Sequence, residues 1–424
     1  MQRRWILVSA LVAALVFVAL GRIATEHRGA RPAGTDQADQ ASRNDPAGQK
    51  DRVGQKDQAG HTGQHGQHGQ ARGTTTPTPS GPPVSSTTVD PDSFFTPTRL
   101  RAGEKPPQFI IVSFDGAGSH ERWDFWRDVA DRAGMRFTGF LSGVYLLDQE
   151  HATSYQAPGH RAGSSAVSFS DNGAAITTLI GDLNEAWRRG YEIGTHFNGH
   201  FCAGSGYSVG QWSRADWNNE LDQFFHFTAN YKQINGIPDA PDLIVPADTI
   251  KGERTPCLEG QQDQLFAALR DHQMTYDSSG NTNGIAWPKQ INGVWEFPLA
   301  EVPMAGSTRG VLSMDYNFFY WQHEAKDADP ATAKKDSQQV LTTYQRMFDA
   351  TYHGNRAPLV LGNHFNSWNH GAYTQALATF VEDACHRPEV RCVPYRDVIR
   401  WMQAQDPAVL TRLQHLPPVD IAHP

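Results

Sequence analysis

Helix-like and strand-like segments alternate along most of this chain. Four amphipathic segments, each followed by a short apolar or β-rich run, cover residues 120–132, 175–189, 261–272 and 337–352. Three of them are followed by a glycine, at Gly134, Gly190 and Gly354. A fifth segment, residues 213–233, opens with Ser213 and Asp216 at capping-box spacing. This alternation predicts an α/β fold: a deformed (β/α) barrel of mainly parallel strands, built as one domain.

The N-terminal quarter has a different pattern. A basic start and an apolar run over residues 5–20 precede low-complexity polar sequence that continues to about residue 96. The run would span about 24 Å as a helix, short for a bilayer core of about 30 Å but long for a signal-peptide core. We predict a signal peptide or membrane anchor (1–24), a disordered linker (25–105) and a folded domain (106–414). We expect the protein to be extracytoplasmic, either secreted or anchored to the membrane by the apolar segment.

Charge limits the partners that the chain can be expected to bind, and cysteine content indicates its disulfides. The net charge of -8 is spread over both signs, so nucleic acid is not expected as a partner, and we expect a monomer. Four cysteines in an exported chain suggest two disulfides. Cys385 and Cys392 are close enough to close a small loop, and a Cys202–Cys257 pair would tie two loops together. Other pairings stay open.

Four strand-like runs end in chemically useful residues. These ends are Asp115, His196, Asp277 and His364. Carboxyl ends of parallel strands meet at one edge of a sheet, so these side chains are expected to share one site. His196 and His200 have the spacing that places two imidazoles on one face of a helical turn, directed at one ion. A zinc-peptidase helix has Glu after its first His, but Phe197 stands there, so Asp115 is the candidate base.

Five motifs occur in an order that resembles a known family. The motifs are Ser113-Phe-Asp-Gly116; His196 with His200; Arg254-Thr-Pro256; Tyr276 to Ser279 with Trp287-Pro288 and Gly293 to Leu299; and Asn355-Arg-Ala-Pro358 leading to His364. Together they resemble the polysaccharide deacetylases, carbohydrate esterase family 4 with its NodB-like domain. The C-terminal half is similar to the animal chitin-deacetylase-like branch. The resemblance covers nearly all of the chain beyond about residue 106.

The resemblance implies a metal-dependent hydrolase that removes N-acetyl groups from a chitin-like polymer or peptidoglycan. His196 and His200 would hold a divalent ion, with Zn²⁺ expected. Asp115 would be the general base, His364 the general acid, and Arg254 would pair with Asp115 and keep it ionised. For the acetylated polysaccharide we expect contacts from Trp368, four residues beyond His364, and from Asp277.

One position departs from the family pattern. The family has a second Asp, a metal ligand, where this chain has Gly116. The metal would then have two histidines and water, unless Asp115 doubles as a ligand or a nearby group such as His120 substitutes. The departure also permits a second interpretation, a carbohydrate-binding protein of the same fold that has lost catalytic strength. An O-acetyl esterase is a third, because it would use the same catalytic residues.

Overall fold

The computed structural model describes residues 94–421, which are built around a curled sheet. Neighbouring strands follow the order β11-β1-β2-β3-β4-β5-β8-β7, and β12 also pairs with β1. Their bounds are β1 Gln108–Asp115, β2 Thr138–Leu141, β3 Glu192–Thr195, β4 Gly252–Glu253, β5 Tyr276–Asp277, β7 Lys289–Ile291, β8 Val294–Glu296, β11 Leu359–His364 and β12 Val390–Cys392. Every pairing is parallel except that of β7 with β8. The expected α/β fold of mainly parallel strands is confirmed, as a barrel that stays open between β7 and β11 among the described residues.

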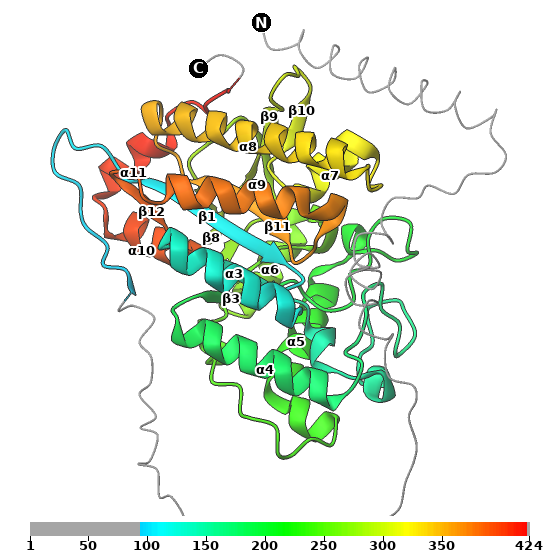
Figure 1. Ribbon diagram of the computed structural model, residues 1–424. Helices are drawn as coiled ribbons and strands as arrows, with labels where there is room; N and C mark the ends of the chain where they lie inside the picture. Colours follow the sequence, from blue (N-terminus) through cyan, green and yellow to red (C-terminus); the bar gives the residue numbers. More distant parts are fainter. Residues whose placement is uncertain (1–93, 422–424) are drawn as a thin grey trace, which may run out of the picture.

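Helices cover the outside of this sheet. They are α3 His120–Ala133, α4 Gly173–Arg188, α5 Arg214–Ile234, α6 Gln262–Asp271, α7 Asp315–His323, α8 Pro330–His353, α9 Trp368–Ala384, α10 Tyr395–Ala404 and α11 Pro407–Gln414. Figure 1 shows α3 and α9 lying over β1, with α8 packed beside α9. The capping box at Ser213 and Asp216 is confirmed. Helix α8 begins seven residues earlier than the pattern predicts, because Asp329 caps it and Pro330 fits its first turn.

A second, smaller sheet was not predicted from the sequence. It consists of β6 Asn281–Asn283, β9 Leu299–Pro303 and β10 Gly310–Leu312, in the order β10-β9-β6. Its strands are short, and β6 is polar and largely exposed, so periodicity gives little signal. After β10, Met314 forms an isolated parallel bridge with Gly362 of β11. This bridge places the start of α7 beside the open edge of the main sheet.

The core fixes the strands whose ends carry the candidate chemistry. All eight residues of β1 are buried. Phe114 packs against Trp126 and Phe137 at ring separations of 4.6 and 5.1 Å, and Tyr276 stacks on Tyr395 at 4.8 Å. Fully burying one large apolar side chain is worth about 1.5–3 kcal/mol. The ends of these strands are therefore held by a densely packed interior.

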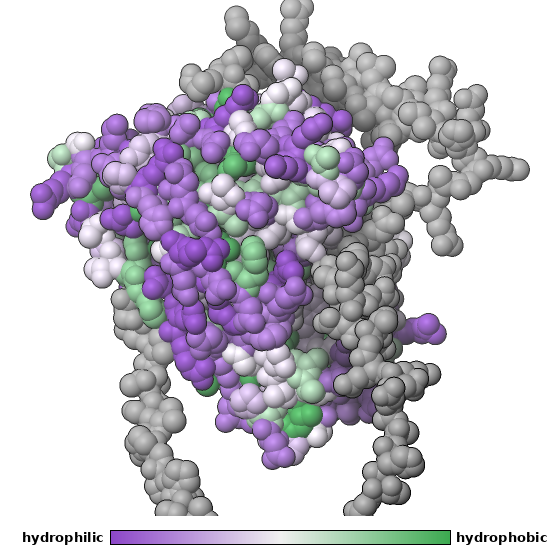
Figure 2. All heavy atoms as spheres, in the orientation of Figure 1, coloured by the Kyte–Doolittle hydropathy of each residue, from purple (hydrophilic) through white to green (hydrophobic). Residues whose placement is uncertain are grey.

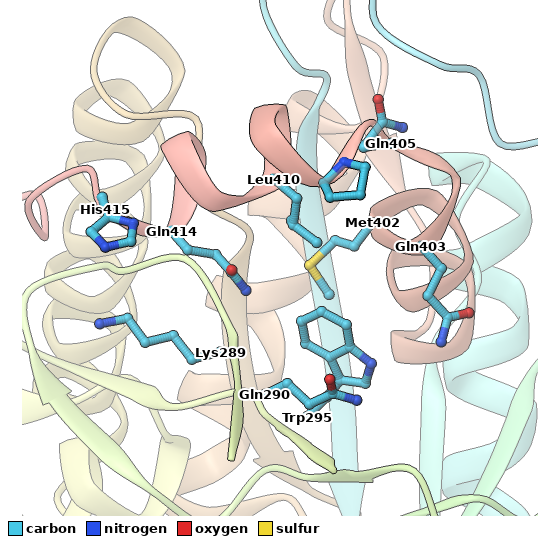
Figure 3. Close-up of a pocket in the computed structure, with 10 residues that line it drawn as sticks. Lys289, Gln290, Trp295, Met402, Gln403, Gln405, Leu410, Gln414 and His415 are labelled. Carbon is cyan, nitrogen blue, oxygen red and sulfur yellow. The ribbon is translucent and has the colours of Figure 1, made fainter. Parts of the chain in front are cut away.

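The surface in view is predominantly hydrophilic, as Figure 2 shows for the helical face. A hollow of about 480 Å³ lies where the β7–β8 hairpin meets α10 and α11. Figure 3 shows Trp295, Met402 and Leu410 in it, with Gln403 and Lys289 among the polar side chains around them. None of the candidate catalytic residues lines this hollow.

The expected localisation needs correction. Within residues 94–421, no helix combines the length and the apolar character needed to cross a bilayer, so a membrane anchor is not supported. The apolar run at residues 5–20, on which that expectation was based, lies outside the described residues, as does most of the expected linker.

Candidate functional site

The carboxyl ends of neighbouring strands bring the candidate residues to one edge of the sheet. Asp115 at the end of β1 is in parallel register with His364 at the end of β11. His196 follows β3 directly, and Arg254 follows β4 directly. Because β3 and β4 are paired in parallel, these two residues lie side by side as well. The sheet order thus supports the sequence prediction of one site at the strand ends for Asp115, His196 and His364, and it places Arg254 beside them.

Asp115 forms a buried ion pair with Arg254. The Nη1 atom of Arg254 donates to Asp115 Oδ1 at 2.9 Å, and the side chains are 0% and 3% exposed. Burial alone raises the pKa of Asp115, but the charges of Arg254, His196 and His364 together outweigh it and lower the pKa. The carboxyl group is therefore ionised at neutral pH, as a general base requires.

The guanidinium of Arg254 is fixed by further partners that the sequence did not indicate. Its Nε donates to the Ser278 carbonyl oxygen at 2.8 Å, and its Nη2 donates to Ser278 Oγ at 3.0 Å and to Tyr395 Oη at 2.9 Å. Tyr395 also contacts Ser113 Oγ at 3.0 Å. With every guanidinium nitrogen in a hydrogen bond, Arg254 holds Asp115 in one orientation.

His364 is oriented by Asp315, which sequence reasoning missed. Asp315 Oδ1 lies 2.8 Å from His364 Nδ1, and its Oδ2 accepts the His364 backbone N–H at 2.8 Å. Asn366 Nδ2 donates to the same carboxylate at 3.2 Å. An ionised carboxylate only accepts, so Nδ1 carries the proton and Nε2 faces Asp115 Oδ2 at 4.0 Å. The run Val311-Leu-Ser-Met ends in Asp315, the same signal that singled out Asp115.

The two histidines of the expected metal site lie close together, but not on a helix. Their ring centroids are 5.1 Å apart. Phe197 and His200 both have left-handed backbone angles, φ 57° and 58°, so the segment is a loop and the predicted helical turn is wrong. His196 Nδ1 lies 2.8 Å from the Arg254 carbonyl oxygen, which can only accept. The lone pair of His196 is therefore on Nε2, the arrangement typical of a metal-ligating histidine.

These donors fit a divalent ion, although the proposed substitute ligand does not join them. Two imidazoles and the Asp115 carboxylate match the ligand types of catalytic zinc sites. His120 instead contacts Asp182 through Nδ1 at 2.9 Å and Asp124 through Nε2 at 3.4 Å, so both ring nitrogens are engaged on α3 and α4. Arg127 pairs with both of those carboxylates, which disfavours a cation there.

The predicted disulfides are confirmed, and one supports the site. Cys202–Cys257 and Cys385–Cys392 are both formed. Cys202 Sγ lies 3.5 Å from His200 Nδ1. The first disulfide thus joins the loop of the histidine pair to the segment just after Arg254, and its bonded sulfurs are not thiolate ligands for a metal.

The structure gives both expected substrate-binding residues other surroundings. Trp368 is 6% exposed and stacks on Phe319 at 5.7 Å, with His364 at 5.1 Å. It forms a wall behind His364 rather than an open platform for a sugar ring, because almost none of its face is accessible. It is the first residue of α9, directly after the short loop that follows His364, and its burial is a tertiary property that sequence position does not reveal.

Asp277 belongs to a separate group of carboxyls. It is in register with Glu253 on one side and Glu296 on the other, and Ser279 donates to it at 2.5 Å. Strand alternation directs Asp277 to the face opposite that of Ser278, which contacts Arg254. Burial, followed by the charge of Asp277, raises the pKa of both Glu253 and Glu296. Asp277 is therefore part of a buried carboxyl ladder and not of the Asp115 cluster.

Comparison with known proteins finds likeness in structure only. No family model matches the chain, and no curated protein matches it. A protein from Mycobacterium smegmatis assigned as a polysaccharide deacetylase is similar over 78% of this chain and 99% of its own, with 15% identity and a TM-score of 0.43. A family 4 pseudoenzyme from Bacillus anthracis is similar over 72% and 70%, with 10% identity and a TM-score of 0.37. The peptidoglycan deacetylase PdaC of Bacillus subtilis is similar over 74% of this chain and 94% of its own, with 10% identity and a TM-score of 0.36. At these TM-scores the function has to be argued from this chain's own residues.

Proposed function

We propose that this chain is a metal-dependent hydrolase of the polysaccharide deacetylase family, and that it removes N-acetyl groups from an acetylated polysaccharide. The observation that supports this most is the register of Asp115 with His364 on adjacent strands. The buried Arg254 holds Asp115, and the buried Asp315 holds His364. A carboxylate base and an imidazole acid at this spacing, beside two further histidines, suit hydrolysis of an amide. We assign the catalytic domain to residues 106–414.

Two histidines would hold the metal, and a carboxylate oxygen lies close by. His196 and His200 would bind a divalent ion, with Zn²⁺ expected, and Asp115 lies close enough to His196 for the histidine to lower its pKa. The bound ion would polarise the acetyl carbonyl group and lower the pKa of water.

Asp115 would take the proton of the attacking water. Arg254 occupies its Oδ1, so Oδ2 is the oxygen turned toward His364 and toward the reacting groups. The water oxygen bonds to the carbonyl carbon as the proton moves to Asp115. Positioned proton transfer of this kind contributes about 10²–10⁴-fold to a rate.

His364 would complete the reaction. In its imidazolium form, with both ring nitrogens protonated, His364 delivers the Nε2 proton to the sugar nitrogen as the carbon–nitrogen bond breaks, which releases acetate and a free amine and leaves the ring neutral. Asp315 stabilises the imidazolium form through Nδ1 and fixes the direction of Nε2. Trp368 and Tyr316 flank the ring, with centroids at 5.1 and 6.4 Å, and limit its movement.

Acetate release from a panel of acetylated polymers, with and without a chelator, tests this function. We expect release from at least one N-acetylated glycan, loss with chelator, and recovery on adding Zn²⁺. An Asp115→Asn protein serves as the control, since it retains both histidines. If acetate is released from no polymer while glycan still binds, the carbohydrate-binding alternative is correct. Release from O-acetylated polymers alone would favour the esterase.

A further inference from the structure

The space beside Gly116, where the family pattern has a ligand carboxylate, is occupied by Tyr145. A Cβ built on Gly116 would lie 3.3 Å from the Tyr145 hydroxyl oxygen. A Cβ on Gly118 would lie only 2.4 Å from Cδ2 of the same ring. The tyrosine ring therefore lies directly on the backbone that follows Asp115, and Gly118 has to lack a side chain for the ring to sit there.

The backbone of Tyr145 is firmly positioned. The residue lies in the short 3₁₀ helix Gly143–Leu146, which follows β2 at the same edge of the sheet as Asp115. Its N–H donates to the Ser142 carbonyl oxygen at 3.1 Å, and its carbonyl oxygen accepts from Ser170 Oγ at 2.6 Å. Neighbouring Val144 and Leu146 are fully buried, whereas Tyr145 is only partly buried. The fold thus anchors both sides of this residue and directs its ring toward the Asp115 loop.

We propose that the phenol oxygen of Tyr145 replaces the carboxylate missing at Gly116 as the third protein ligand of the metal site. This inference rests on the proposed function. The unperturbed pKa of a tyrosine hydroxyl is about 10. A neighbouring divalent ion favours the deprotonated form. The proton leaves to solvent when the oxygen–metal bond forms. The phenolate then supplies one negative charge and one oxygen, as the carboxylate would.

The same geometry changes the expectation for a carboxylate at residue 116. Gly116 has φ +63°, a conformation that strains most side chains, and its Cβ would already contact the tyrosine hydroxyl. A Gly116→Asp substitution alone should therefore not tighten metal binding. Combined with Tyr145→Ala, which vacates the space, it should restore a third charged ligand.

Zinc affinity, measured by competition with a graded series of chelators, tests the assignment. Tyr145→Phe keeps the ring on the glycines and removes only the oxygen, and thermal unfolding of the variant checks that it is folded. We expect its zinc affinity to fall by about 10–100-fold, at least the loss seen when groups that support metal ligands are removed. Tyr352→Phe is the matched control, because it also removes a hydroxyl, one that donates to the Pro388 carbonyl oxygen at 3.0 Å; its affinity should not change.

A spectroscopic measurement gives a second readout independent of activity. Copper(II) bound to the wild-type protein should show phenolate-to-metal charge-transfer absorption, and Tyr145→Phe should lack it. Wild-type affinity and spectrum in Tyr145→Phe, together with lost binding in His196→Ala, would overturn the tyrosine assignment and leave the proposed function intact. No zinc binding by the wild-type protein, or full binding by His196→Ala, would instead refute the metal site itself.

Discussion

Asp315→Asn isolates the group that orients the proposed acid. The substitution keeps size and shape, but the carboxylate now accepts from His364 Nδ1, the His364 backbone N–H and Asn366 Nδ2 at 2.8, 2.8 and 3.2 Å. An amide has one acceptor oxygen and one donor nitrogen. Whichever way it turns, either the ring N–H or the backbone N–H of His364 faces a donor.

The size of the effect follows from the bond to the charged group. A hydrogen bond to a charged partner contributes about 1.5–3 kcal/mol, and it matters most when His364 is an imidazolium. At about 1.4 kcal/mol per tenfold, its loss should lower kcat by roughly 10–150-fold. Zinc content should be unchanged, because Asp315 contacts neither His196 nor His200 in any hydrogen bond of the described structure.

A second buried pair in the same protein supplies the control. Asp336 Oδ2 lies 2.7 Å from His323 Nε2 and also accepts from Asn369 Nδ2 at 2.8 Å, away from the strand ends. Asp336→Asn should therefore destabilise the fold in a similar way without the drop in kcat. Acetate release at saturating substrate, with thermal unfolding of each variant, separates the two effects. If Asp315→Asn turned over at the wild-type rate, or if both variants lost kcat equally, the orienting role of Asp315 would be refuted.

Three further outcomes are expected. Asp115→Asn should retain metal and lose about 10²–10⁴-fold in kcat, measured by acetate release; near-normal turnover would identify another base. Burial and the charge of Asp277 raise the pKa of Glu296, so its contribution to stability is fully present below the ordinary glutamate value of 4.5 and is lost as pH rises toward the higher folded value. Melting temperatures from pH 6 to 9 should therefore fall more for the wild type than for Glu296→Gln, and equal slopes would contradict this. Cys202→Ser opens a disulfide whose cysteines are 55 residues apart, which in the chain-entropy model costs about 4 kcal/mol in denaturant unfolding; an unchanged midpoint would refute it.

The strand ends were predictable because they depend on local pattern. An apolar run that stops at Asp115 or His364 is visible in the sequence, and parallel pairing then brings such ends together. The disulfides were also within reach, because cysteine placement at loop ends limits the choices. The helical period located α3, α4 and α6 to within about two residues.

The rest depended on contacts between distant segments. Asp315 precedes His364 by 49 residues, and a single bridge from Met314 to β11 brings it into place. The spacing of His196 and His200 suited a helix, yet left-handed backbone angles achieve the same proximity in a loop. Neither the burial of Trp368 nor the ring of Tyr145 over two glycines has a signature in residue order.

Strand pairing fixes the distance between Asp115 and His364. Adjacent strands in a sheet lie about 4.8 Å apart, and both residues are terminal members of the same hydrogen-bonded ladder. Loop movements can therefore admit or reject polymers of different width without altering the gap between proton acceptor and proton donor. Substitutions that adapt the protein to a new glycan should accumulate in the loops around the strand ends. A bond should not be hydrolysed when its attacking water and its leaving group cannot reach Asp115 and His364 at the same time.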